Sequence, residues 1–247
     1  MCKKEEIPYR GYLIQTYYHD DGGSPREWDN LGTIAYKHRN YCLGEEEISD
    51  PVDWLMYKLD MDHDQVEKMI TRDFVHPYPT VYSNEVRKRL EDMFYDRYIA
   101  LPIYLYDHSG ITINTTGYNH LGMHGYFDSG QVGYIYASKD AIRKEYGWKN
   151  ITEKRRPKIL EYLEGEVKEF NQYLTGEVYG YVIDDIDSCC NFYDYEYMLS
   201  EAKSIIDCQI KENIKKHAER VKVWCRNRVP LKYREPLKLR GEVWIAN

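Results

Sequence analysis

Apolar residues recur at helical spacing in six stretches of the chain, and five of these stretches open with a residue type that starts helices. These opening residues are Asp50, which precedes Pro51, and Asp62, Ser83, Ser138 and Thr152. The spacing predicts helices over 51–59, 62–70, 83–97, 138–146 and 152–174, with Gly176 as the C-cap of the last one, and a long helix over 195–224. The predicted buried stripe of the long helix consists of Met198, Ala202, Ile205, Ile206, Ile210, Ile214, Val221 and Trp224.

Short apolar or alternating segments between turn-forming residues predict the strands. They cover 9–18, 33–38, 101–106, 111–113, 132–136 and 179–183, with a terminal strand pair over 231–245. The fold class predicted is α+β, a small central, mainly antiparallel sheet packed by several amphipathic helices, with a long C-terminal helix. We expect an α+β core domain over residues 1–200, and a basic helical extension over 201–247 that packs on this core.

Charge is distributed unevenly along the 247 residues. Residues 1–137 hold 22 acidic and 13 basic side chains, whereas residues 201–247 hold 6 acidic and 12 basic ones. The acidic main part argues against a broad nucleic-acid surface there, because phosphate binding needs clustered Lys and Arg. The basic C-terminal stretch could contact nucleic acid, or it could be a solvated helix face paired with the acidic part of the same protein.

Two further features of the composition constrain location and surface. No apolar segment opens the chain and no apolar run is long enough to span a bilayer, so we expect a cytoplasmic protein without a membrane partner and with reduced cysteines. The 26 Tyr residues, against 5 Phe and 5 Trp, indicate either a core with polar edges or a recognition surface rich in tyrosine.

Polar residues of catalytic type follow the predicted buried strand 101–106. Asp107, His108 and Ser109 are adjacent, and neighbours on a strand point to opposite faces, so they cannot form a triad among themselves. The candidate catalytic residues are Asp107, His108, Ser109 and Asp128. A composite site is possible in which Asp107 or His108 pairs with Asp128 or Ser129, just before the predicted strand 132–136. The alternative is that both Asp-containing segments are simply turns.

Other candidate chemistry has less support in the sequence. No set of His, Cys, Asp and Glu has a spacing typical of a metal site, and we predict no metal. The phosphate-binding patterns GxGxxG and GxxxxGK do not occur, and we predict no cofactor. No cysteine has an obvious basic neighbour that would activate it as a nucleophile.

The segment 20–32 is a long loop dense in turn-forming residues, and loops of this length inside a compact domain are often functional. Arg and Trp are the residues that most often contribute binding energy at interfaces. The candidate binding residues are Ser24, Arg26, Trp28, Asp29 and Asn30 in this loop, with Ser129 and Gln131 from the later segment. The alternative is an ordered loop held over the sheet by its own Trp.

Several of these segments together resemble one protein family. SPREWDNLGT at 24–33, DHSG at 107–110, DSGQVGYIY at 128–136, KEYGWK at 144–149 and YLTGEVYG at 173–180 are similar to a family of small uncharacterised proteins of tailed phages and mobile elements. The resemblance covers roughly residues 9–200. It carries no established activity, but it implies a phage accessory protein, and such proteins often block host defences.

This resemblance and the acidic main part lead to two hypotheses. The first is a phage-encoded protein that counteracts a host defence system in the host cytoplasm, for example as an anti-CRISPR inhibitor that binds a protein or nucleoprotein effector. The second is a hydrolase or nuclease, with or without a metal ion, in which Asp107, His108 and Asp128 act as acid, base or metal-binding groups. A virion or replication accessory protein is a third possibility.

Overall fold

The computed structural model describes residues 5–19, 22–122, 127–184 and 186–228, and the chain divides into two compact units. Unit 1 comprises residues 1–20 and 178–247, and unit 2 comprises residues 21–177. Unit 2 is therefore inserted in the chain of unit 1. Along the sequence, the boundaries between the units fall at 20/21 and 177/178. We expected a boundary at residue 200, which lies inside a helix.

Unit 1 is a four-stranded antiparallel sheet with one long helix. Its strands are β1 (Glu5–Tyr9), β2 (Tyr12–Tyr18), β8 (Tyr179–Ile183) and β9 (Asp187–Phe192), in the order β1-β2-β8-β9. The stretch 9–18, which we predicted as one strand, is interrupted by a turn at Arg10 and Gly11, whose φ angles are 49° and 86°. Positive φ at both central residues is the geometry that closes a two-residue hairpin, so β1 and β2 form a hairpin.

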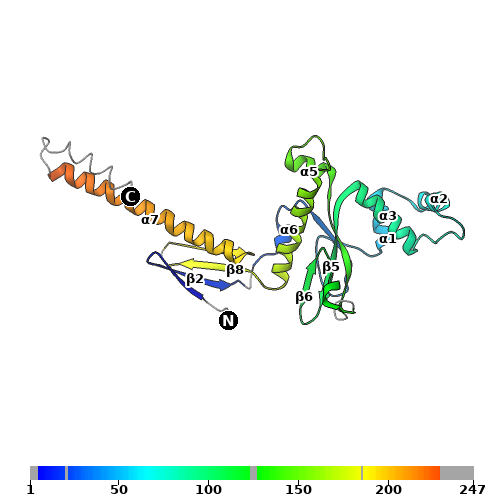
Figure 1. Cartoon of the computed structure of the whole chain (residues 1–247), viewed down its shortest axis with the longest axis horizontal. Coiled ribbons are helices and arrows are strands. Elements are labelled where there is room, and N and C mark those ends of the chain that lie inside the picture. The colour runs from blue at the N-terminus through cyan, green and yellow to red at the C-terminus, as the bar shows by residue number, and fades with distance from the viewer. Residues whose placement is uncertain (1–4, 20–21, 123–126, 185, 229–247) are drawn as a thin grey trace. The chain divides into compact units, whose positions relative to one another are not determined.

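Helix α7 (Tyr195–Arg228) packs on this sheet only through its first half. Met198, Ala202 and Ile206 are buried against Ile14, Tyr181 and Ile183, and Ile205 and Ile210 are partly buried beside them. Farther along, Ile214, Val221 and Trp224 are exposed, and Figure 1 shows α7 continuing well past the ends of β2 and β8. The stripe predicted to be buried is therefore buried only up to Ile210, because the sheet ends there.

Unit 2 contains a five-stranded sheet in the order β4-β3-β7-β5-β6. Its strands are β3 (Thr33–Tyr36), β4 (Glu46–Glu47), β5 (Tyr98–Asp107), β6 (Ile111–Asn114) and β7 (Ser129–Ser138). Pairing is antiparallel throughout except between β3 and β4. The central strand β7 approaches β3 closely at Gly133, where a Cβ atom would lie 1.9 Å from the carbonyl oxygen of Ala35, so glycine is required there.

Helices cover both faces of this sheet, which gives unit 2 three layers (Figure 1). One face packs against α1 (Pro51–Leu59), α2 (His63–Asp73) and α3 (Asn84–Arg97), and the other against α5 (Lys139–Tyr146) and α6 (Arg156–Leu174). Two short 3-10 helices, η1 (Pro25–Glu27) and η2 (Asn119–Leu121), lie in its loops. Successive residues of β5, such as Ile99 and Ala100, face opposite layers.

The predicted helix starts are confirmed where a capping side chain defines them. Asp50, Ser83 and Ser138 accept hydrogen bonds from the first turns of α1, α3 and α5, and Asp62 forms a reciprocal capping box with Gln65 at α2. Helix α6 instead begins at Arg156, after a turn that starts at Thr152, and Thr175 occupies the C-cap position expected for Gly176.

The α+β class, the mainly antiparallel pairing and the long C-terminal helix are confirmed. The strands are divided between two sheets, where we had expected one central sheet. The strand pair predicted over 231–245 lies outside the described residues.

Many of the tyrosines are core residues with polar edges. Tyr36, Tyr118, Tyr134, Tyr136, Tyr181 and Tyr193 are buried. Others, including Tyr57, Tyr82 and Tyr197, are exposed on helices or loops. The first of the two interpretations of the composition therefore accounts for a substantial part of the tyrosine content.

Candidate functional site

The Asp-His-Ser-Gly segment forms the hairpin connection between β5 and β6. Asp107 is the last residue of β5 and pairs with Ile111, so His108, Ser109 and Gly110 make up the loop. Ser109 and Gly110 have φ angles of 60° and 145°, and the His108 amide donates to the Gly110 carbonyl at 3.1 Å. The segment is a turn, and all four of its residues are exposed.

The turn nevertheless brings His108 and Asp128 together. Strand β7 runs antiparallel to β5 with Ser129 opposite Tyr106, so Asp128 reaches the same end of the sheet as His108. His108 Nδ1 lies 3.4 Å from Asp128 Oδ2, and the two side chains are 58% and 36% exposed. The imidazole also stacks on Tyr106, with ring centroids 5.8 Å apart. This is the His–Asp pairing that the sequence allowed, in an open position.

Asp107 points to a different partner. The Tyr41 hydroxyl donates to Asp107 Oδ2 at 3.3 Å, and the negative charge of Asp107 raises the pKa of Tyr41. Tyr41 in turn stacks on His38, with centroids 4.8 Å apart. The four residues predicted as catalytic thus separate into a His108–Asp128 pair, an Asp107–Tyr41 pair and a turn residue, Ser109.

The predicted binding residues Ser129 and Gln131 lie at the start of β7, opposite Tyr106 and Tyr104 of β5. The amide of Gln131 donates to the Gly133 carbonyl at 3.4 Å, which keeps it on its own strand. Gln131 is exposed and Ser129 is half-exposed, so both side chains lie on the surface near the His108–Asp128 pair.

Loop 24–30 is held in place by its own polar groups. Ser24 Oγ accepts a hydrogen bond from the Arg26 amide and caps η1. The Asn30 side chain donates to the carbonyls of Pro25 at 2.8 Å and Trp28 at 3.1 Å. Ser24 and Asn30, both predicted to bind a partner, therefore stabilise the loop itself.

Arg26 anchors the loop to α6 and to the segment before β4. Its guanidinium donates to Glu166 at 3.0 Å, to Glu45 at 2.8 Å and to the Gly32 carbonyl at 2.6 Å. The side chains of Arg26 and Glu166 are only 7% and 5% exposed. Glu166 also accepts from the amides of Leu31 and Gly32, so a single buried carboxylate ties the guanidinium and the backbone together. We call this set the Arg26 clamp.

The structure thus separates the loop residues into two groups. Arg26 is buried as a structural ion pair and has little surface left for a partner, unlike the interface arginine that we predicted. Trp28 is 49% exposed and Asp29 is exposed, so these two side chains face the solvent. The partners Glu45 and Glu166 were missed in the sequence, although Glu166 interrupts the apolar face of its helix, which is a recognisable signal.

A second polar cluster, also missed, lies beside the aromatic residues on the α1 face of the sheet. Glu46 accepts hydrogen bonds from Lys58 at 2.9 Å, Tyr136 at 2.8 Å and Trp54 at 3.2 Å. Burial would raise the pKa of Glu46, but these hydrogen bonds outweigh it and hold the pKa below its usual value. Burial and the bond to Glu46 raise the pKa of the Tyr136 hydroxyl. These polar groups satisfy one another's hydrogen-bonding capacity, as expected for a structural cluster.

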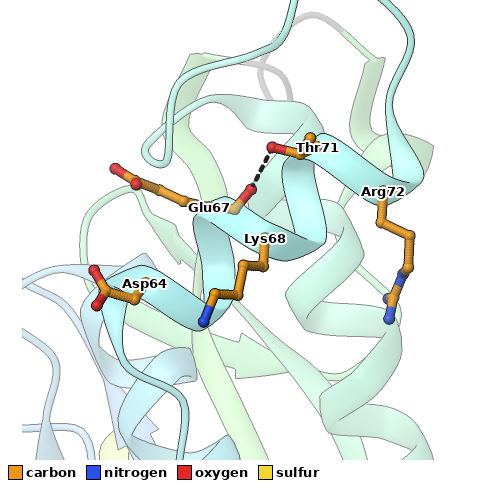
Figure 2. Close-up of a pocket in the computed structure, with 5 residues that line it drawn as sticks. All are labelled: Asp64, Glu67, Lys68, Thr71 and Arg72. Carbon is orange, nitrogen blue, oxygen red and sulfur yellow. Dashed lines mark hydrogen bonds between the residues drawn. The ribbon is translucent and has the colours of Figure 1, made fainter.

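Two hollows on unit 2 lie away from the His108–Asp128 pair. One, of about 420 Å³, lies between β6 and α6 and includes Asn114, Glu161 and Asn171. The other, of about 440 Å³, lies on α2. Figure 2 shows that its lining side chains, Asp64, Glu67, Lys68, Thr71 and Arg72, project outward from this one helix, and the hydrogen bond drawn joins Thr71 to the Glu67 carbonyl. The α2 hollow is an open helix surface and not an enclosed site.

Within the described parts of the chain, no three His, Cys, Asp or Glu side chains gather as they would around a metal ion. Over the same residues, no helix is at once long and apolar enough to cross a membrane. Comparison with protein-family models, with curated proteins and with solved structures finds no match to this chain.

Proposed function

We propose that this protein is a phage-encoded accessory protein that counteracts a host defence system by binding a protein or nucleoprotein effector in the host cytoplasm. A CRISPR effector is the example we favour. The phage origin rests on the family resemblance of the segments at 24–33, 107–110 and 128–136. The observation that carries the binding mode is the exposed Trp28, presented by a loop that the Arg26 clamp anchors.

A preorganised aromatic residue is well suited to recognition. Large aromatic side chains dominate the energetics of interfaces, and a loop that is already ordered loses little conformational entropy on binding. Asp29 is exposed next to Trp28 and adds a negative charge. Unit 2 as a whole holds 27 acidic and 19 basic residues, a net charge of −8. This charge suits a partner with a basic surface, such as the nucleic-acid channel of an effector complex.

The experiment compares phage survival on host strains that each carry one defined CRISPR effector, with and without this protein. We expect protection in at least one strain, and we expect Trp28→Ala to weaken binding of that purified effector by about 30-fold, the loss typical of an interface hot spot. Tyr57→Ala, which removes an even more exposed aromatic side chain from α1, is the matched control and should bind normally. Absence of protection in every defence-bearing strain would refute the proposal.

The second candidate function is a hydrolase or nuclease, with or without a metal ion. The His108–Asp128 contact at 3.4 Å favours it, because a carboxylate that orients an imidazole is the arrangement by which many enzymes position a general base. Asp107, 3.3 Å from Tyr41, would then lie at the edge of such a site.

Two substitutions decide between the candidates. If the protein acts by binding through Trp28, then His108→Ala and Asp107→Ala retain full phage protection, and this is the result we expect. A general base contributes about 100-fold or more to a rate, so loss of protection on that scale in His108→Ala would instead support the hydrolase. Ser109→Ala, in the same exposed turn, controls for damage to the hairpin, and circular dichroism checks the fold of each variant.

A further inference from the structure

The second half of α7 is a surface without a structural role in the described part of unit 1. Contacts with the sheet end at Ile210, and from Lys211 to Arg228 every residue is exposed or half-exposed. An isolated helix is marginally stable in water, so a helix that extends this far beyond its sheet gains from a partner.

Four of the seven basic residues on this segment follow one line along the helix. Lys211, Lys215, Lys222 and Arg226 are separated by 4, 7 and 4 residues. At 100° per residue these positions fall within a sector of about 60°, and they extend over about 22 Å along the axis. All four are exposed, and none forms an ion pair with a described residue. We call these four residues the basic stripe.

The surrounding charge strengthens the stripe. The segment 211–228 holds seven basic and two acidic residues, in a chain whose overall net charge is −7. One of the two carboxylates, Glu212, lies 3.5 Å from Lys216 and pairs with it. Lys216 is not part of the stripe. A concentration of positive charge on an acidic protein attracts anionic partners over distances of about a Debye length.

We propose that the basic stripe binds the phosphate backbone of duplex nucleic acid. A straight row of cations that pair with no described residue fits a polyanion whose phosphates recur regularly, and such contacts do not depend on base sequence. An anionic membrane surface fits less well, because the opposite face of the helix, Ile210, Ile214, Val221 and Trp224, is interrupted by His217 and ends at Arg228. The inference rests on α7 alone and is independent of the defence-blocking function.

Fluorescence anisotropy with the purified full-length chain and a labelled 20-base-pair DNA duplex of arbitrary sequence tests this inference. Four phosphate contacts predict a slope of about −3.6 for the logarithm of the binding constant against the logarithm of salt concentration. The variant K211Q/K215Q/K222Q/R226Q should bind at least tenfold more weakly at 100 mM salt, with a much shallower slope. Vesicles that contain anionic lipid are titrated in parallel.

The matched control is K68Q/K88Q/K149Q/K154Q, which removes four exposed lysines of unit 2 and changes the net charge equally. This control should bind the duplex as the wild type does, and circular dichroism should show equal helix content in all three proteins. Equal weakening in both variants, no measurable duplex binding by the wild type, or binding to the vesicles alone would each overturn the inference.

Discussion

Replacement of Glu166 by alanine is expected to lower the free energy of unfolding of unit 2 by about 3–5 kcal/mol. The substitution leaves the Arg26 guanidinium buried with one carboxylate partner fewer, and an uncompensated buried charge is costly. It also removes the acceptor for the amides of Leu31 and Gly32. The substitution would therefore both destabilise unit 2 and remove the contacts that anchor the loop presenting Trp28.

Urea denaturation followed by tryptophan fluorescence measures this effect. Glu164→Ala, at an exposed position two residues away on α6, is the matched control and should change stability by less than about 0.5 kcal/mol. The double variant Arg26→Ala/Glu166→Ala should lose less stability than the sum of the losses in the two single variants, because it removes both charges at once. A Glu166→Ala variant as stable as Glu164→Ala would contradict the structural role of the clamp.

Phe94→Ala is expected to destabilise unit 2 by a similar amount, about 3–5 kcal/mol. Phe94 is fully buried at the centre of an aromatic cluster between α3, α1 and the sheet. The centroid of its ring lies 4.9–6.0 Å from the centroids of five other rings, which are those of Trp54, Tyr95, Tyr98, Tyr134 and Tyr136. Truncation removes the apolar contacts and leaves a cavity that these large, mutually packed rings fill only in part.

The same denaturation measurement applies, and Trp54 reports directly because it belongs to the cluster. Tyr57→Ala removes an exposed ring from the neighbouring helix, and it should leave the midpoint of unfolding nearly unchanged. A loss below about 1 kcal/mol for Phe94→Ala would mean that the cluster repacks and that the tyrosine-rich core is not tightly specified.

The sequence was informative wherever a local interaction determines the structure. Asp50, Asp62, Ser83 and Ser138 cap helices through bonds to amides two or three residues away, and such signals need no knowledge of the fold. Strand β5 was recognisable because its residues are apolar over most of its length. The Arg10–Gly11 turn was missed, since the stretch around it is continuously rich in aromatic and β-branched residues.

The candidate site was predictable only in part, because its geometry depends on distant residues. His108 meets Asp128 through the register of β5 and β7, which sequence spacing alone does not give. Arg26 looked like an interface residue because its partner Glu166 is 140 positions away. A carboxylate between Leu163 and Phe170 on an apolar helix face was the one available sign that a buried cation lies opposite.

The insertion of unit 2 into unit 1 also has a consequence for synthesis on the ribosome. Strand β2 pairs with β8, whose residues lie about 160 positions later in the chain, as Tyr18 opposite Tyr179 illustrates. At about 5–20 residues per second, the N-terminal hairpin waits roughly 8 to 32 seconds for this partner. Unit 2 is continuous in sequence and emerges complete during that interval. Unit 2 can therefore fold first, and the sheet of unit 1 is completed last.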